Sequence, residues 1–245
     1  MKEALGPLRL CGEGHLAEAV CAVVLVRVEE PQFHLGLRRG DEAHEPVLHL
    51  AWHRRLLDQA LVEVIQPHGR LLPAAVIALS LDPAVNEVLQ VLASRVAIRY
   101  ANRPDHPSSI AYGFGDGVAT FAHEDGRLTD PDAAFTCSTF VLAMLRGVGV
   151  ELIDVARWRA PTEDDVHWQR AIGQKLLAWI AERIHGDLAC ANERVAEDVG
   201  SRRYRPTDVA GAALFGPETW PVGVDEVEPR ACELEAMLSW SGLPA

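Results

Sequence analysis

Apolar residues in the first part of the chain follow the spacing of β-strands. The run at residues 20–28 is almost wholly apolar and branched, which is typical of a strand buried on both faces. Residues 33–39 and 47–52 alternate between apolar and polar side chains, and the segment 40–46 between them carries the Gly, Asp and Pro of a turn. We therefore predict a strand hairpin beside a buried strand.

The next segments mix strand and helix signals. Residues 56–65 fit a helix through apolar positions three and four apart, but a strand is also compatible with them. Residues 71–81 resemble a strand toward their end. Asp82 is suited to cap a helix and Pro83 to be its first residue, and the apolar spacing predicts a helix that ends near Tyr100.

Helical patterns dominate the second half of the chain. Residues 101–132 are rich in Gly, Pro and Asn, and a loop of this length is usually functional or mobile. A helix is predicted from Cys137 to about Gly147, a long one over 164–184 and another over 188–199. From Pro206 we expect a short helix followed by loops that contain Pro and Trp.

Composition and charge narrow the class of protein. The chain has 245 residues, of which 49% are hydrophobic and 24% charged, which is ordinary for a globular protein. Its formal net charge of −12 argues against a nucleic-acid partner or an anionic membrane surface, because both require a basic surface. The short Arg pairs at 38–39, 54–55 and 202–203 are interpreted as solvated faces. No apolar run reaches the ~18 residues of a membrane-spanning helix.

The cysteines indicate a reducing compartment. They lie at positions 11, 21, 137, 190 and 232, without the Cys-x-x-Cys spacing of a metal site. The N-terminal segment lacks the continuous apolar region of a secretory signal, so we expect reduced thiols and a cytoplasmic protein. No cofactor and no metal is predicted.

Cys137 is the candidate for chemistry. At a helix start, the dipole and the free amide hydrogens favour the thiolate over the thiol. Upstream, His34 and His49 lie on the two predicted hairpin strands, where side chains on one face can come within hydrogen-bonding reach. A thiol, an imidazole base and a group that orients the base are the parts of a Cys–His hydrolase. His53 competes with His49 for the orienting position.

Other interpretations of these residues remain open. A lone Cys is often simply a buried small apolar side chain, and strand histidines can be satisfied by backbone carbonyls. His34, His49 and Cys137 are also suitable zinc ligands, although a fourth ligand at recognisable spacing is missing. The glycine-rich segment 113–117 has neither the strand nor the Lys-Ser/Thr of a phosphate loop and indicates a turn or a flexible lid.

Three motifs together resemble a known family. They are His34-Leu-Gly-Leu-Arg-Arg-Gly40, Val47-Leu-His-Leu-Ala-Trp52 and Thr136-Cys-Ser-Thr-Phe-Val141. The set resembles the circularly permuted branch of the NlpC/P60 papain-like superfamily, which includes the lecithin-retinol-acyltransferase-like proteins. In this branch the His and a polar residue precede the Cys, as they do here. The Ser-Thr after Cys137 is closer to bacterial permuted hydrolases than to the acyltransferases.

The resemblance implies a fold and a domain plan. The fold would be α+β and papain-like, in the circularly permuted NlpC/P60 arrangement, with an antiparallel sheet packed on the Cys-bearing helix and extra C-terminal helices. Residues 1–155 would form the catalytic core, and residues 156–245 a helical extension packed on the same domain.

The resemblance also implies roles for single residues. Cys137 would be the nucleophile, His34 the general base and His49 the orienting residue, with Tyr112 on the oxyanion side or in contact with substrate. The expected function is a cysteine hydrolase that cleaves an amide bond of a peptide or cell-wall-type peptide through an acyl-enzyme. The alternatives are a thiol hydrolase or acyltransferase for lipid esters, and an inactive binding module of the same fold. The expected partner is a small peptide or acyl substrate.

Overall fold

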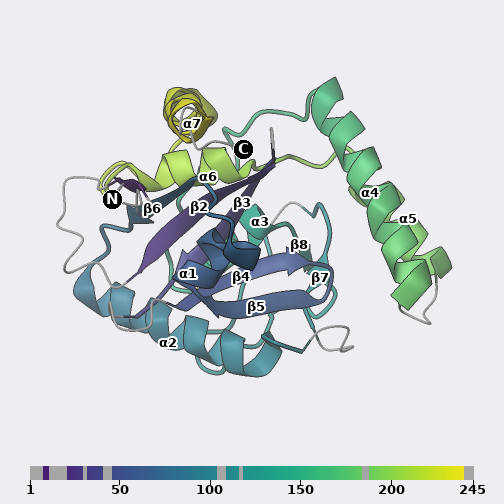
Figure 1. The fold of residues 1–245 in the computed structure, drawn as a ribbon, viewed down its shortest axis with the longest axis horizontal. Helices are drawn as coiled ribbons and strands as arrows, with labels where there is room; N and C mark the ends of the chain where they lie inside the picture. Colours follow the sequence, from purple (N-terminus) through teal and green to yellow (C-terminus); the bar gives the residue numbers. More distant parts are fainter. Residues whose placement is uncertain are drawn as a thin grey trace.

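The apolar run near the N-terminus forms an inner strand of a six-stranded sheet, to which helices are added on both faces (Figure 1). The computed structural model describes residues 8–10, 21–29, 32–40, 46–103, 109–115, 118–183 and 188–239. Over these residues the protein is α+β, as the sequence predicts.

The sheet has the strand order β1-β6-β2-β3-β4-β5. Its strands are β1 (Leu8–Leu10), β2 (Ala22–Glu29), β3 (Gln32–Arg38), β4 (Pro46–Trp52), β5 (Arg55–Ala60) and β6 (Ala74–Ala78). Five strands are antiparallel to their neighbours, and β1 joins the edge parallel to β6. Two short strands, β7 (Ala111–Tyr112) and β8 (Ala134–Phe135), pair separately.

The strand predictions are confirmed, and the ambiguous segment proves to contain both structures. Residues 55–60 are strand β5, and helix α1 (Leu61–Ile65) follows directly. Leu61 and Ile65, four residues apart, are the buried positions of that short helix. A 3-10 turn, η1 (Pro67–Gly69), leads on to β6. Most of the predicted hairpin turn, residues 41–45, lies outside the described residues.

The sheet opens between β3 and β4. Their described ladder has only two pairs, Leu37 with Leu48 and Arg38 with Val47, whereas β2 and β3 pair along nearly their whole length. Figure 1 shows the β2–β3 and β4–β5 halves diverging, with helix α3 (Cys137–Arg146) at the opening. The first residues of β3 are therefore free of β4 and face the start of α3.

Helices cover the two faces of the sheet unequally. Helix α2 (Pro83–Tyr100) is capped by Asp82 as predicted, since the Asp82 Oδ1 accepts a hydrogen bond from the Ala84 amide at 2.8 Å. With α3, α6 (Pro206–Ala213) and α7 (Val224–Ser239) it encloses the larger core on one face. The opposite face carries a smaller cluster beneath α1.

The described residues of the second half of the chain form one helix more than the sequence predicted. The two long helices are confirmed as α4 (Glu163–Arg183) and α5 (Leu188–Asp198), which form a hairpin at one side of the molecule (Figure 1). The expectation of loops after α6 is wrong, because α7 follows. Pro229 lies inside α7 and obscures its pattern, but its buried side chains have helical spacing: Val227, Ala231, Leu234 and Leu238.

No helix among the described residues combines the length and apolar character that crossing a membrane requires.

Candidate active site

Two of the predicted site residues form a direct pair. His34 on β3 and His49 on β4 lie 2.8 Å apart, measured from His34 Nε2 to His49 Nδ1. Their rings meet edge to face at an interplanar angle of 76°. The pair bridges the two strands where their backbones have separated. Gly36 makes this approach possible, because a Cβ there would stand 3.1 Å from the His49 Cβ.

A third polar residue, which the sequence did not indicate, continues the row. The other ring nitrogen of His49, Nε2, lies 3.0 Å from Gln59 Oε1 on β5. Gln59 pairs with Val47, and Leu57 pairs with His49, so Gln59 and His49 share one face of adjacent strands. The signal was hidden because residues 56–65 fit a helix as well as a strand, and the register of β5 was undetermined.

Gln59 fixes the tautomers of both imidazoles. Its Oε1 can only accept, so His49 carries its proton on Nε2 and donates to Gln59. The neutral His49 ring then accepts at Nδ1 from the Nε2–H of His34. His34 is left with an unprotonated Nδ1. This lone pair is the one that a general base requires.

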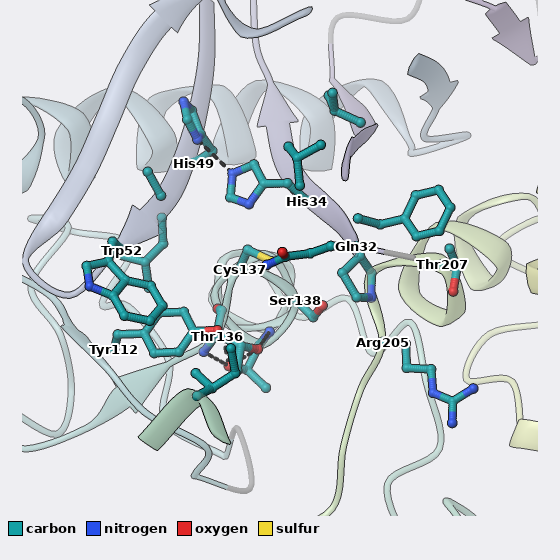
Figure 2. A pocket seen from close by; sticks show the side chains of 18 of the residues that line it. Gln32, His34, His49, Trp52, Tyr112, Thr136, Cys137, Ser138, Arg205 and Thr207 are labelled. Atoms are coloured by element: carbon teal, nitrogen blue, oxygen red, sulfur yellow. Dashed lines mark hydrogen bonds between the residues drawn. The ribbon is translucent and has the colours of Figure 1, made fainter. Parts of the chain in front are cut away.

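Cys137 occupies the predicted position at the start of a helix. Thr136 caps α3 and forms a reciprocal capping box with Thr139, which holds the first turn rigid. The Cys137 side chain lines a cavity and is 9% exposed. Its sulfur receives a hydrogen bond from the backbone of Leu35, the residue after His34. Figure 2 shows the His34 ring between His49 and Cys137.

Burial determines the resting charge of the thiol. Desolvation raises the pKa of Cys137, while the Leu35 amide, the Ser138 hydroxyl and the amides at the helix start lower it. The helix-start amides thus lower the pKa of Cys137, as predicted, but burial raises it by more. Because the pKa is raised, Cys137 rests as the thiol.

The two imidazoles are also uncharged near neutral pH. Burial, together with the neighbouring His49, lowers the pKa of His34 to about 3. Burial lowers the pKa of His49 as well, although Gln59 opposes this shift by accepting a hydrogen bond from the His49 ring. The resting site consequently holds a thiol beside a neutral base.

The site opens into a cavity of about 950 Å³. His34, His49, Gln59 and Cys137 all line it, so the thiol is not sealed in the core. In Figure 2 the amide of Gln32, at the start of β3, points toward Cys137. Ser138, the second residue of α3, follows Cys137 directly and is buried.

Tyr112 forms part of the cavity wall. It lies on β7, and its ring packs against Trp52 with the ring centroids 4.8 Å apart. Burial and the neighbouring Cys137 raise the pKa of its hydroxyl, so Tyr112 remains a phenol that can donate a hydrogen bond.

His53 has a different partner from the one considered for it. Its Nδ1 accepts a hydrogen bond from the Tyr112 amide at 3.2 Å, and its ring packs on Trp179 of α4. The structure thus places His49, and not His53, against His34. His53 connects the β7 segment to α4.

The second half of the chain supplies one side of the cavity, which the sequence did not predict. Trp168 of α4 lines it, and the guanidinium of Arg203 lies 3.9 Å from the centre of the Trp168 ring. Arg203 also pairs with Asp165 at 3.1 Å. The interpretation of the Arg pairs as solvated faces is wrong for Arg203, which Asp165 and Trp168 hold at the cavity, and for Arg38, which is 5% exposed.

Within the part of the chain that the structure describes, no three His, Cys, Asp or Glu side chains are grouped as metal ligands. Comparisons with family models, with curated proteins and with solved structures found no match.

Proposed function

We propose that this chain is a cysteine hydrolase that cleaves an amide bond through an acyl-enzyme on Cys137. The observation that carries the proposal is the hydrogen-bonded row from Gln59 through His49 to His34, which leaves the Nδ1 lone pair of His34 for a thiol in the same cavity. The order His34, His49, Cys137 and the sheet that opens at α3 are consistent with the permuted NlpC/P60 papain-like arrangement.

The first half of the reaction forms the acyl-enzyme. The Cys137 sulfur attacks the substrate carbonyl carbon while the thiol proton passes to His34 Nδ1. The carbonyl electron pair moves to oxygen and gives a tetrahedral oxyanion. The imidazolium then gives its proton to the leaving nitrogen, and the C–N bond breaks to release an amine. His34 donates to His49 throughout, so its positive charge is shared along the row.

The oxyanion needs hydrogen-bond donors that are already in place. Backbone amides at the start of α3 are such donors, because they lack partners within the helix. The amide of Gln32 points toward the sulfur and is suited to be a side-chain donor. In the second half of the reaction, His34 takes a proton from a water molecule whose oxygen attacks the thioester carbonyl carbon. The C–S bond then breaks and the acid is released, while the imidazolium returns the proton to the Cys137 sulfur.

The test is direct capture of the acyl-enzyme. The protein is mixed with short N-acyl peptide p-nitroanilides and with a matched acyl thioester, quenched in acid, and mapped by peptide mass spectrometry. We expect the acyl mass on Cys137, and its loss in Cys137→Ser. The exposed Cys232 on α7 is the internal control for non-specific acylation. Equal acyl labelling of Cys137 and Cys232 from the thioester would contradict the proposal.

A further inference from the structure

The charge of the cavity is opposite to the charge of the whole chain. Four cationic side chains line it, namely Lys175, Arg202, Arg203 and Arg205, but only two acidic ones, Glu63 and Glu235. The chain as a whole has a net charge of −12. A local excess of cations in a strongly acidic protein indicates a site that attracts an anion.

The acids on the cavity wall already have partners from the protein itself. Glu235 accepts a hydrogen bond from the Thr207 hydroxyl at 2.8 Å. Glu63 accepts one from the Ala60 amide at 3.2 Å, as part of the cap of α1. Neither carboxylate pairs with one of the four cations in the described structure.

The two inner cations share one carboxylate. Arg203 and Arg205 both approach Asp165 Oδ1, at 3.1 and 3.5 Å. Asp165 also accepts from the Thr162 hydroxyl, and the buried Arg205 Nε has no partner. Asp165 is thus shared by two guanidinium groups, and the nearby Asp208 acts on both of them while it also pairs with Arg159 at 3.4 Å.

The two outer cations have no acidic partner within the described chain. Lys175 and Arg202 are both exposed at the cavity edge. On α4, Trp168, Ile172 and Lys175 recur at a helical spacing of four and three residues and line the same cavity. An apolar strip thus ends at a cation, which is the arrangement that an acyl chain with a terminal carboxylate would fit.

We propose that the substrate acylating Cys137 carries a carboxylate, which Lys175 and Arg202 bind at the α4 edge of the cavity. This inference rests on the proposed hydrolase function and adds the chemical class of its acyl substrate. Arg203, whose guanidinium lies 3.9 Å from the centre of the Trp168 ring and pairs with Asp165, lines the same cavity. A guanidinium and an ammonium together suit a carboxylate, because both donate charge-assisted hydrogen bonds to it.

The test uses alkylating probes that need no knowledge of the natural substrate. N-iodoacetyl ω-amino acids of increasing chain length are compared with their carboxamides, which are neutral and nearly the same size. The reaction with Cys137 is followed by peptide mass spectrometry, with Cys232 as the reference thiol. For each chain length, the rate with the acid is divided by the rate with the carboxamide. At one chain length we expect this acid-to-amide ratio to be at least about fivefold higher at Cys137 than at Cys232.

Matched variants assign the effect to the two residues. Lys175→Gln and Arg202→Gln should each lower the acid-to-amide ratio at Cys137 toward that of Cys232. Arg170→Gln removes a cation from the exposed side of the same helix and should leave the ratio unchanged. A ratio no higher than that of Cys232 at every length, or a high ratio that neither variant lowers, would overturn the inference.

The neutral probes report separately on the proposed function. If the carboxamides alkylate wild-type Cys137 and the His34→Gln variant at the same rate, the hydrolase proposal fails, and the substrate inference fails with it. If His34→Gln slows alkylation of Cys137 by the carboxamides, but the acids show no higher acid-to-amide ratio at Cys137 than at Cys232, only the substrate inference fails.

Discussion

Gln59 sets the direction of proton transfer, although it does not contact the nucleophile. Its Oε1 accepts from His49 Nε2, and this single contact determines where each imidazole carries its proton. Were Gln59 to present a donor, both tautomers would reverse and His34 would direct an N–H at the thiol. At the residue scale, the chemistry therefore depends on an acceptor two side chains away from the sulfur.

The first prediction separates positioning by Gln59 from simple packing. Gln59→Leu removes the acceptor. Because a general base contributes about 10²–10⁴-fold to the rate, and Gln59 only orients that base, kcat should fall by at least about tenfold. Gln59→Glu keeps an acceptor at the same reach and should retain most of the activity, with a higher pKa for His49. Steady-state kinetics of both variants on one substrate provide the check. Equal losses in the two variants would mean that Gln59 only fills space.

The second prediction concerns the acid side of the pH profile. Because burial and His49 hold the pKa of His34 at about 3, the base stays unprotonated well below the usual histidine range. The value of kcat/KM should therefore stay nearly constant from neutral pH down to about pH 5, because the pKa of the base in the free enzyme determines where kcat/KM falls on the acid side. A fall in kcat/KM centred near the ordinary histidine pKa of about 6.5 would show that His34 is solvated and ordinary.

At the level of elements, the opening between β3 and β4 creates the site. The alternation of residues 33–39 and 47–52 was sufficient to predict the two strands that carry His34 and His49. It could not show that the ladder stops after two pairs, because strand divergence depends on what packs between the strands. The position of Gln59 followed from the register of β5, which an ambiguous apolar pattern left undetermined.

The third prediction tests the close approach of these two strands. A methyl group at Gly36 would lie 2.7 Å from Val47 Cγ1 and 3.1 Å from His49 Cβ. Gly36→Ala should lower the free energy of unfolding by about 1–3 kcal/mol and reduce activity, since His49 must move. Urea unfolding measures the first effect. Gly115→Ala is the matched control, because its methyl would meet nothing closer than 3.5 Å, and a Gly36→Ala protein as stable and active as this control would contradict the account.

At the scale of the whole molecule, residues far apart in the chain build one cavity. The nucleophile and its base come from the first 140 residues, whereas Trp168, Lys175 and Arg202 come from the helical second half. The sequence predicted α4 as a helix but not what it faces, because its apolar positions suit a core as well as a cavity wall. The missed helix α7 likewise contributes Glu235 to the cavity.

The part-buried His34 also links the stability of the fold to pH. Below its ordinary pKa of 6.5 the unfolded chain binds a proton at His34, whereas the folded protein binds it only near pH 3. The free energy of unfolding should therefore fall as the pH drops between these values, by about 1.4 kcal/mol per pH unit from this residue. Above pH 6.5 both states are neutral there, and the residue adds no pH dependence.

Denaturant unfolding over this pH range compares wild type with His34→Gln. The variant lacks the titrating group, so its stability should depend less steeply on pH. Identical slopes for the two proteins would show that His34 is accessible to protons in the folded state.

The proposed reaction requires His34 to take the proton of Cys137, and the alkylation rate of this thiol depends on that transfer. The second-order rate of iodoacetamide with Cys137 at neutral pH is measured in wild type and in His34→Gln, with the exposed Cys232 as the internal reference. Because Cys137 rests as a buried thiol, its reaction depends on a neighbouring base. We predict that the variant alkylates Cys137 at least about tenfold more slowly while Cys232 is unchanged. Equal rates at Cys137 in the two proteins would contradict the account.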